Sequence, residues 1–197
     1  MNNKAGTGTT IAITLGVIFL IVLIIGSFVS GTYNSLVDKD TSVENQFAKV
    51  QTAYQRRADL IPNLVETVKG SVKFEQDTQT QIAALRSGIN NAKTPDQLDK
   101  AGKNLNSFVS GIMVNVEAYP DLKSNQNFLS LQDELAGTEN RIKWERDNYN
   151  NAVKDYKVNV RSFPSNMIAG MFGFNVDKWE MFSASEGSDQ APKVSFN

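Results

Sequence analysis

Two adjacent arginines, Arg56 and Arg57, followed closely by Asp59, form the most unusual charged cluster in the chain. Neighbouring positions of a helix point in different directions, so the two guanidinium groups cannot serve one site together. Arg57 continues an apolar stripe after Tyr54, and it is therefore the arginine that we expect to be buried. A buried guanidinium needs a carboxylate partner, so the chemistry predicted here is ion pairing.

The partner of Arg57 must come from another part of the fold. Asp59 is too near in sequence to face it well, whereas Glu139 and Asp121 lie in the second half of the chain. We favour a buried ion pair that fixes the register of the helices over a solvated arginine face. Both are favoured over a ligand-binding or catalytic role.

The residue types that enzymes use most often are missing from the chain. It has no histidine and no cysteine, which removes the commonest general base, the usual zinc ligands and thiolate chemistry. The Glu-x-x-His pairs of di-metal bundles cannot exist, and no Ser-x-x-Lys, Gly-x-Ser-x-Gly or phosphate-loop motif is present. We therefore expect a protein that is not an enzyme and that has no cofactor and no metal site.

The segment from Met167 to Phe182 is strongly apolar. It could cap the end of a helical bundle, or it could form a surface for self-association or membrane contact. Because Lys178 is its only cation, we prefer protein contact over lipid contact. The candidate residues for self-association are Phe172, Phe174, Trp179 and Phe182.

Charge is balanced along the chain, with 20 basic and 21 acidic side chains and a net charge of −1. No stretch has the basic excess that binding to a phosphate backbone requires. We therefore expect no nucleic-acid partner.

Residues 11–29 form an uninterrupted run without a charged side chain. A helix of this length reaches roughly 28 Å, about the thickness of the hydrocarbon core of a bilayer. A cleaved signal peptide would have a shorter apolar core and a better cleavage site than the one near Val29. We expect a retained single-pass anchor that contacts membrane lipid through residues 11–29. Basic residues beside a membrane span favour the cytoplasmic side. The short N-terminal flank carries one, Lys4, so we slightly favour a cytoplasmic N-terminus with the bulk of the chain outside.

Apolar residues after the run recur every three or four positions, which predicts helices. The expected helical segments cover residues 33–57, 61–89, 94–119 and 124–161, with Pro62 either kinking a continuing helix or beginning a new one. Thr94, Pro95 and Gln97 have the pattern of a capping box at a helix start. The predicted fold is all-α: a single N-terminal transmembrane helix followed by a long antiparallel up-down four-helix bundle.

The expected organisation has four parts. A short N-terminal flank covers residues 1–10, the transmembrane anchor residues 11–29, the helical bundle residues 31–182, and a flexible C-terminal tail residues 183–197.

Several motifs strongly resemble the LemA family, and they run from the anchor to Phe174. They include the sequence from Tyr54 to Glu66, the sequence Tyr119-Pro120-Asp121-Leu122, and the sequence from Phe163 to Asn166. The residues of the first motif that mark it best are Arg56, Arg57, Asp59, Leu60, Pro62 and Asn63.

The resemblance implies an N-terminally anchored helical bundle in the bacterial cell (inner) membrane, in a family whose molecular role is unsettled. Relatives include proteins implicated in shaping bacterial organelle membranes, and some members are encoded beside a membrane metalloprotease. The favoured hypothesis is a homo-oligomeric, self-assembling or scaffolding component of the bacterial envelope. The alternative is an adaptor or substrate-presenter for a membrane protease in envelope stress, which would have a membrane protein as its partner.

Overall fold

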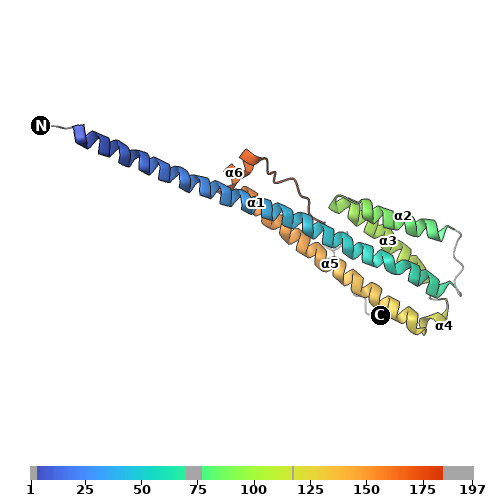
Figure 1. Ribbon diagram of the computed structural model, residues 1–197. Helices are drawn as coiled ribbons and strands as arrows, with labels where there is room; N and C mark the ends of the chain where they lie inside the picture. The colour runs from blue at the N-terminus through green and yellow to red at the C-terminus, as the bar shows by residue number, and fades with distance from the viewer. Residues whose placement is uncertain (1–3, 70–76, 117, 184–197) are drawn as a thin grey trace, which may run out of the picture. The chain divides into compact units, whose positions relative to one another are not determined.

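The computed structural model describes residues 4–69, 77–116 and 118–183. Within these ranges the chain is helical and contains no strand, as the sequence predicts (Figure 1). The helices are α1 (Lys4–Val68), α2 (Thr78–Asn91), α3 (Pro95–Val116), α4 (Pro120–Lys123), α5 (Gln126–Arg161) and α6 (Ser165–Phe172).

Helix α1 is one unbroken helix of 65 residues that includes Pro62. The first part of the predicted segment 61–89 belongs to α1 and its last part to α2, and residues 70–76 between them lie outside the described residues. Proline inside a helix removes one backbone hydrogen bond, and packing on both sides offsets that loss here. Ile61 is 1% exposed and Leu64 is fully buried.

The start of α3 has the capping that the sequence predicts. The backbone N–H of Gln97 donates to Thr94 Oγ1 at 3.3 Å. The side chain of Gln97 accepts a hydrogen bond from the backbone N–H of Lys93 at 2.8 Å, and Pro95 is the first residue of the helix. These contacts satisfy backbone donors that have no partner within the helix.

The chain divides into two compact units. The first contains residues 1–42 and 154–178, and the second contains residues 43–153 and 179–197. Helices α1 and α5 contribute residues to both, while α2, α3 and α4 belong to the second unit and α6 to the first.

The second unit has a core made by α1, α3 and α5. Tyr54 of α1 packs so closely on Gly102 of α3 that a Cβ atom there would lie 2.8 Å from the Tyr54 Cζ atom. Helix α2 joins α1 through Gln51, whose Nε2 donates to the Ile89 carbonyl at 2.8 Å. The buried apolar side chains follow the predicted stripes and include Val43, Val50, Leu98, Leu105, Ile112, Leu135, Ile142 and Tyr149.

The first unit combines α1, the last turns of α5, and α6. Leu36 and Tyr156 are fully buried in it. The Tyr156 hydroxyl donates to the Asn175 carbonyl at 3.0 Å, and the Lys178 ammonium contacts Asp40 at 2.7 Å. These contacts hold the segment after α6 against the helices.

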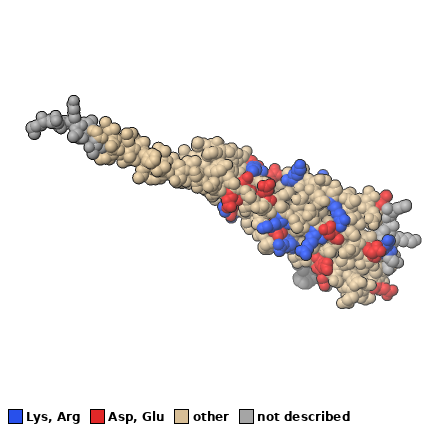
Figure 2. Space-filling view, viewed as in Figure 1, with Lys and Arg blue, Asp and Glu red and all other residues tan. Residues whose placement is uncertain are grey.

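Residues 11–29 lie within α1, the one helix of the described chain that is long and apolar enough to cross a membrane. Its large apolar side chains from Ile11 to Phe28 are 47–65% exposed. Figure 2 shows no charged atoms along this stretch on the face in view. The helix therefore offers an apolar surface all around, as a bilayer-spanning helix must.

Candidate partner-binding groove

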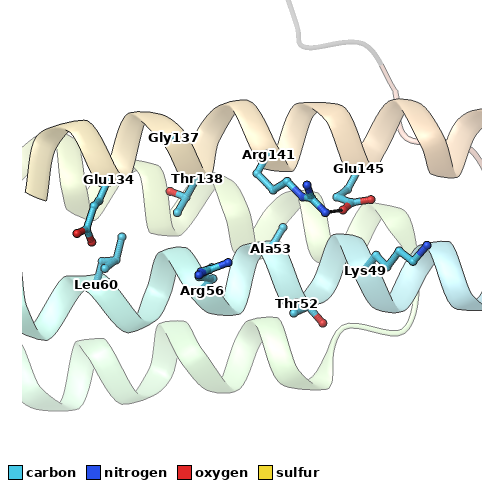
Figure 3. A pocket seen from close by; sticks show the side chains of 10 residues that line it. All are labelled: Lys49, Thr52, Ala53, Arg56, Leu60, Glu134, Gly137, Thr138, Arg141 and Glu145. Atoms are coloured by element: carbon cyan, nitrogen blue, oxygen red, sulfur yellow. Dashed lines mark ion pairs between the residues drawn. The ribbon is translucent and has the colours of Figure 1, made fainter.

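A groove of about 760 Å³ lies between α1 and α5 in the second unit (Figure 3). Its walls are two stripes, one on each helix, whose members recur every three or four residues and so share a face. The lining residues are Lys49, Thr52, Ala53, Arg56 and Leu60 from α1, and Glu134, Gly137, Thr138, Arg141 and Glu145 from α5.

Small side chains keep this groove open. Ala53 is buried between the helices, and Thr138 turns its hydroxyl back to donate to the Leu135 carbonyl at 2.7 Å. A Cβ atom on Gly137 would meet nothing within 4 Å. Space of this kind between two helices admits a third helix or an extended segment.

Charged side chains of both signs surround the small ones. Lys49, Arg56 and Arg141 supply cations, while Glu134 and Glu145 supply carboxylates. In Figure 3 the Glu134 side chain lies at one end of the groove and Lys49 at the other. One end therefore carries the Glu134 carboxylate and the other the Lys49 ammonium, beside the Arg141–Glu145 ion pair.

Glu145 is the most constrained of these charges. It is 2% exposed, and its Oε1 atom contacts the Arg141 guanidinium at 2.7 Å. Arg141 in turn lies over the Trp144 ring, 4.6 Å from its centroid. The other oxygen of Glu145, Oε2, is buried and accepts no hydrogen bond from the described residues. A buried carboxylate oxygen without a donor is costly, so Glu145 is a strained polar group in the wall of the groove.

Arg57 lies outside the groove lining and contacts Glu139 of α5. The Arg57 side chain is 9% exposed, and that of Glu139 is 52% exposed. Asp121, the other candidate partner, lies in α4 with its side chain exposed. The structure thus brings together Arg57 and Glu139, from helices far apart in the sequence.

The remaining residues of the Arg-Arg-x-Asp motif are dispersed. Asp59 contacts Arg86 of α2 at 2.9 Å, a partner that sequence reasoning missed. Arg56 and Leu60 line the groove. Pro62 is half-buried, and Asn63 is exposed. The motif therefore contributes to contacts with α2 and α5 and to the groove, rather than to one compact site.

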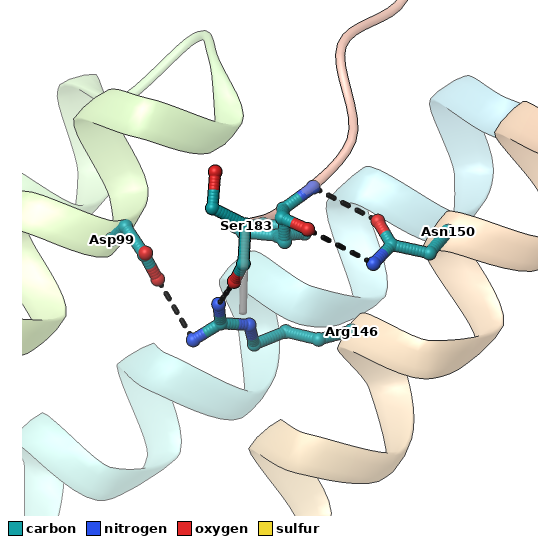
Figure 4. Close-up of polar contacts among 5 residues, drawn as sticks. Asp99, Arg146, Asn150 and Ser183 are labelled. Atoms are coloured by element: carbon teal, nitrogen blue, oxygen red, sulfur yellow. Dashed lines mark hydrogen bonds and ion pairs between the residues drawn. The ribbon is translucent and has the colours of Figure 1, made fainter. Parts of the chain in front are cut away.

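A second polar cluster fixes the chain after α6 to α5 within the second unit (Figure 4). Arg146 contacts Asp99 at 2.8 Å and donates to the Ser183 carbonyl at 3.0 Å. Asn150 exchanges two hydrogen bonds with the Phe182 backbone, at 2.9 and 3.1 Å. These contacts hold the segment in place and bury Phe182 to 5% exposure against Tyr149.

Burial in this region affects the tyrosine hydroxyls. It raises the pKa of Tyr149 to about 12, and the nearby Glu180 carboxylate adds to that effect. Burial also raises the pKa of Tyr54, although the Arg146 guanidinium opposes the change. Both hydroxyls are therefore neutral at ordinary pH and act as hydrogen-bonding groups.

The four candidates for self-association differ in exposure. Phe172 is 51% exposed, Phe174 and Trp179 are half-buried, and Phe182 is buried within its own unit. Phe182 therefore has little surface left for a partner. The tail beyond Ser183 lies outside the described residues.

The groove itself was not identified from the sequence, because it depends on which faces of α1 and α5 meet. One signal is present in the sequence: Glu145 is the charged residue in a mostly apolar stripe. In the described ranges, no group of three or more acidic side chains could hold a metal ion.

Comparison with known proteins identifies the family. The LemA family model matches residues 46–196. Protein LemA of Metamycoplasma hominis is 26% identical over 180 residues, which cover 88% of this chain and 76% of that protein. Magnetosome proteins MamQ 1 and MamQ 2 of Paramagnetospirillum magneticum are each 24% identical over 168 residues, which cover 72% of this chain and 62% of each relative. The chain therefore spans less than two thirds of these two relatives. Since the family model matches most of the chain, this protein belongs to the LemA family.

Proposed function

We propose that this protein is a membrane-anchored, non-enzymatic scaffold that assembles with copies of itself through the groove between α1 and α5. The single observation that carries the proposal is the groove, which has the Glu134 carboxylate at one end and the Lys49 ammonium at the other. In this proposal, residues 11–29 cross the bacterial cell membrane and residues 31–182 form an up-down four-helix bundle. Two relatives are named for an organelle, the magnetosome, which fits an architectural role.

Two-fold symmetry explains why a second copy is a suitable occupant. A two-fold axis through the middle of the groove places the Glu134 end of one copy against the Lys49 end of the other. Each contact then occurs twice, so two pairs of opposite charge form. The small residues Ala53, Gly137 and Thr138, which lie beside Arg56 and Arg141 in the groove, leave room for the helices of the second copy.

A charge-swap experiment tests this arrangement in the full-length protein. Lys49→Glu and Glu134→Lys each place like charges together, and each is expected to weaken association about tenfold, or ~1.4 kcal/mol. The double variant restores both pairs in reversed order and should associate like the native protein. Lys100→Glu, on an exposed position of α3, is the matched control. Analytical ultracentrifugation in detergent measures the association.

The outcomes separate the hypotheses. Recovery in the double variant supports the twofold contact. Weakening that is merely additive in the double variant would show that Lys49 and Glu134 do not meet. Unchanged association in all variants would exclude the groove as the interface. Copurification of a second protein at fixed stoichiometry, lost in the single variants, would instead favour the adaptor role at a membrane protease.

The proposed orientation places the bulk of the chain outside the cytoplasm. Because the native protein has no cysteine, Ser110→Cys on an exposed position of α3 creates a single thiol. We expect a membrane-impermeant maleimide to label it in intact cells. Labelling that requires cell lysis would reverse the orientation.

A further inference from the structure

Helix α6 and Phe163, which lies two positions before it, expose several large apolar side chains. Phe163 is 81% exposed, Met167 62%, Met171 77% and Phe172 51%. Met167 and Met171 are four positions apart within α6, so they lie along one side of the helix, and Phe163 lies in the turn that precedes it. Ile168 and Ala169 are buried and hold another side of α6 to the protein, and Phe172, four positions after Ile168, lies on that side and contacts Tyr33. Residues 162–176 contain no charged side chain.

Helix α6 lies next to the end of the apolar run in α1, within the same unit. The Phe172 ring lies 4.8 Å from the Tyr33 ring, and the Phe174 ring lies 5.9 Å from it. Tyr33 follows Val29, the last residue of the run, by four positions, which is about 6 Å along a helix. Figure 1 shows α6 beside α1.

The turn after α6 fixes this position. Gly173 has a φ of 79°, a left-handed conformation that glycine adopts without strain and that ends the helix. The backbone N–H of Phe174 then donates to the Ala169 carbonyl at 3.0 Å, and the Phe174 ring returns to Tyr33. Two aromatic contacts with α1 therefore hold α6 one helical turn beyond the run.

In a bilayer, a position about 6 Å beyond the end of the membrane-spanning run lies in the headgroup region. The polar layer adds roughly 5–8 Å on each side of the hydrocarbon core. Aromatic side chains are favoured there, and a short amphipathic helix can lie in the plane of the interface with its apolar face in the lipid. The four exposed side chains would otherwise face water at the membrane surface.

We propose that the exposed side of α6 formed by Met167 and Met171, together with Phe163 in the preceding turn, inserts into the boundary between headgroups and acyl chains beside the transmembrane helix. The segment has few cations, and for that reason the sequence favours protein contact. A low number of cations does not prevent insertion into lipid here. Basic residues recruit free helices to anionic lipid, whereas α6 is held at the surface by the span to which it packs. The inference requires residues 11–29 to cross the membrane, and it is independent of self-assembly through the groove.

Site-specific fluorescence tests this insertion in the full-length protein. Met171→Cys is labelled with an environment-sensitive fluorophore and reconstituted into phosphatidylcholine vesicles, with and without phosphatidylglycerol. Some of the lipids carry a nitroxide quencher near the headgroup. Asn104→Cys, on an exposed position of α3, is the matched control. Met167→Cys repeats the test at a second position of the face, and circular dichroism checks that each variant remains helical.

We expect the label at position 171 to show blue-shifted emission and strong quenching by the nitroxide lipid in both types of vesicle, while the label at position 104 shows neither. Emission typical of water with no quenching at positions 167 and 171 would overturn the proposal. A blue shift without lipid quenching, lost on dilution of the protein in the membrane, would also overturn it and assign the face to contact between copies. Quenching only with phosphatidylglycerol would contradict the stated independence from cations.

Discussion

The contact between Arg57 and Glu139 makes a quantitative prediction about stability. Removing one partner of a buried ion pair costs about 3–5 kcal/mol, whereas an exposed pair contributes about 0–1 kcal/mol. Here the Arg57 side chain is 9% exposed and the Glu139 side chain 52% exposed, so an intermediate cost applies. The Nε atom of Arg57 is buried and already lacks an acceptor among the described residues. We expect Glu139→Ala to lower the free energy of unfolding by ~1.5–3 kcal/mol.

Glu139→Ala should lower the free energy of unfolding much less when the buried charge of Arg57 is absent. Arg57→Met replaces the guanidinium by an apolar side chain that can fill much of the same space. In that background, Glu139→Ala leaves no unpaired buried cation, and we expect it to cost less than ~0.5 kcal/mol. The difference between the two backgrounds is the coupling energy, which should be ~1–2.5 kcal/mol.

Urea unfolding of the full-length protein in detergent, followed by the helical circular dichroism signal, measures all four members of this cycle. Asp133→Ala removes an exposed carboxylate from the same helix and is the matched control, expected within ~0.5 kcal/mol of the native protein. The reasoning is refuted if Glu139→Ala has the same cost in both backgrounds. It is also refuted if that cost equals the cost of Asp133→Ala.

Three further predictions concern the core of the second unit. Leu135 is 3% exposed, and Leu135→Ala should cost ~2–5 kcal/mol in urea unfolding; no loss would place Leu135 outside the core. Gly102→Ala should cost ~1–2 kcal/mol despite the better helix propensity of alanine, because the new methyl group meets the Tyr54 ring; a stabilised variant would contradict this packing. The raised pKa of Tyr149 predicts that its contribution to stability is complete below pH 10 and is lost between pH 10 and about 12, since only the unfolded chain releases the proton in that range. Measuring the free energy of unfolding as a function of alkaline pH should show this fall. In Tyr149→Phe, the slope of that free energy against pH should be shallower by up to ~1.4 kcal/mol per pH unit. Equal slopes in the two proteins would contradict the assignment.

The helical faces were predictable because they depend on local spacing. The stripes through Val43, Val50 and Tyr54 in α1, and through Leu135 and Ile142 in α5, are buried as expected. The first turn of α3 was predictable for a related reason, since its capping residues are neighbours in the sequence.

The continuation of α1 past Pro62 was not predictable in the same way. Pro62 is the strongest local signal for a helix end, yet α1 continues to Val68. Burial of Ile61 and Leu64 on either side favours continuation, and that burial comes from the other helices. Tertiary packing therefore outweighs the local preference of proline.

Some contacts of the candidate site were predictable from the sequence, and others were not. Arg57 and Glu139 could be proposed as partners because the stripe after Tyr54 indicated burial of Arg57, and burial demands a counter-charge. The pairing of Asp59 with Arg86 and the groove around Glu145 depend on which helix faces meet. No periodicity within one helix contains that information.

The measurement that tests the central claim most directly is the mass of the full-length protein, extracted gently from native membranes, with the copurifying chains identified. The account predicts a discrete particle whose protein mass is a multiple of the 21.7 kDa chain, which contains only this chain and whose association is about tenfold weaker in Lys49→Glu. A particle with a single copy of the chain, or one with a second protein at a fixed ratio, would contradict it.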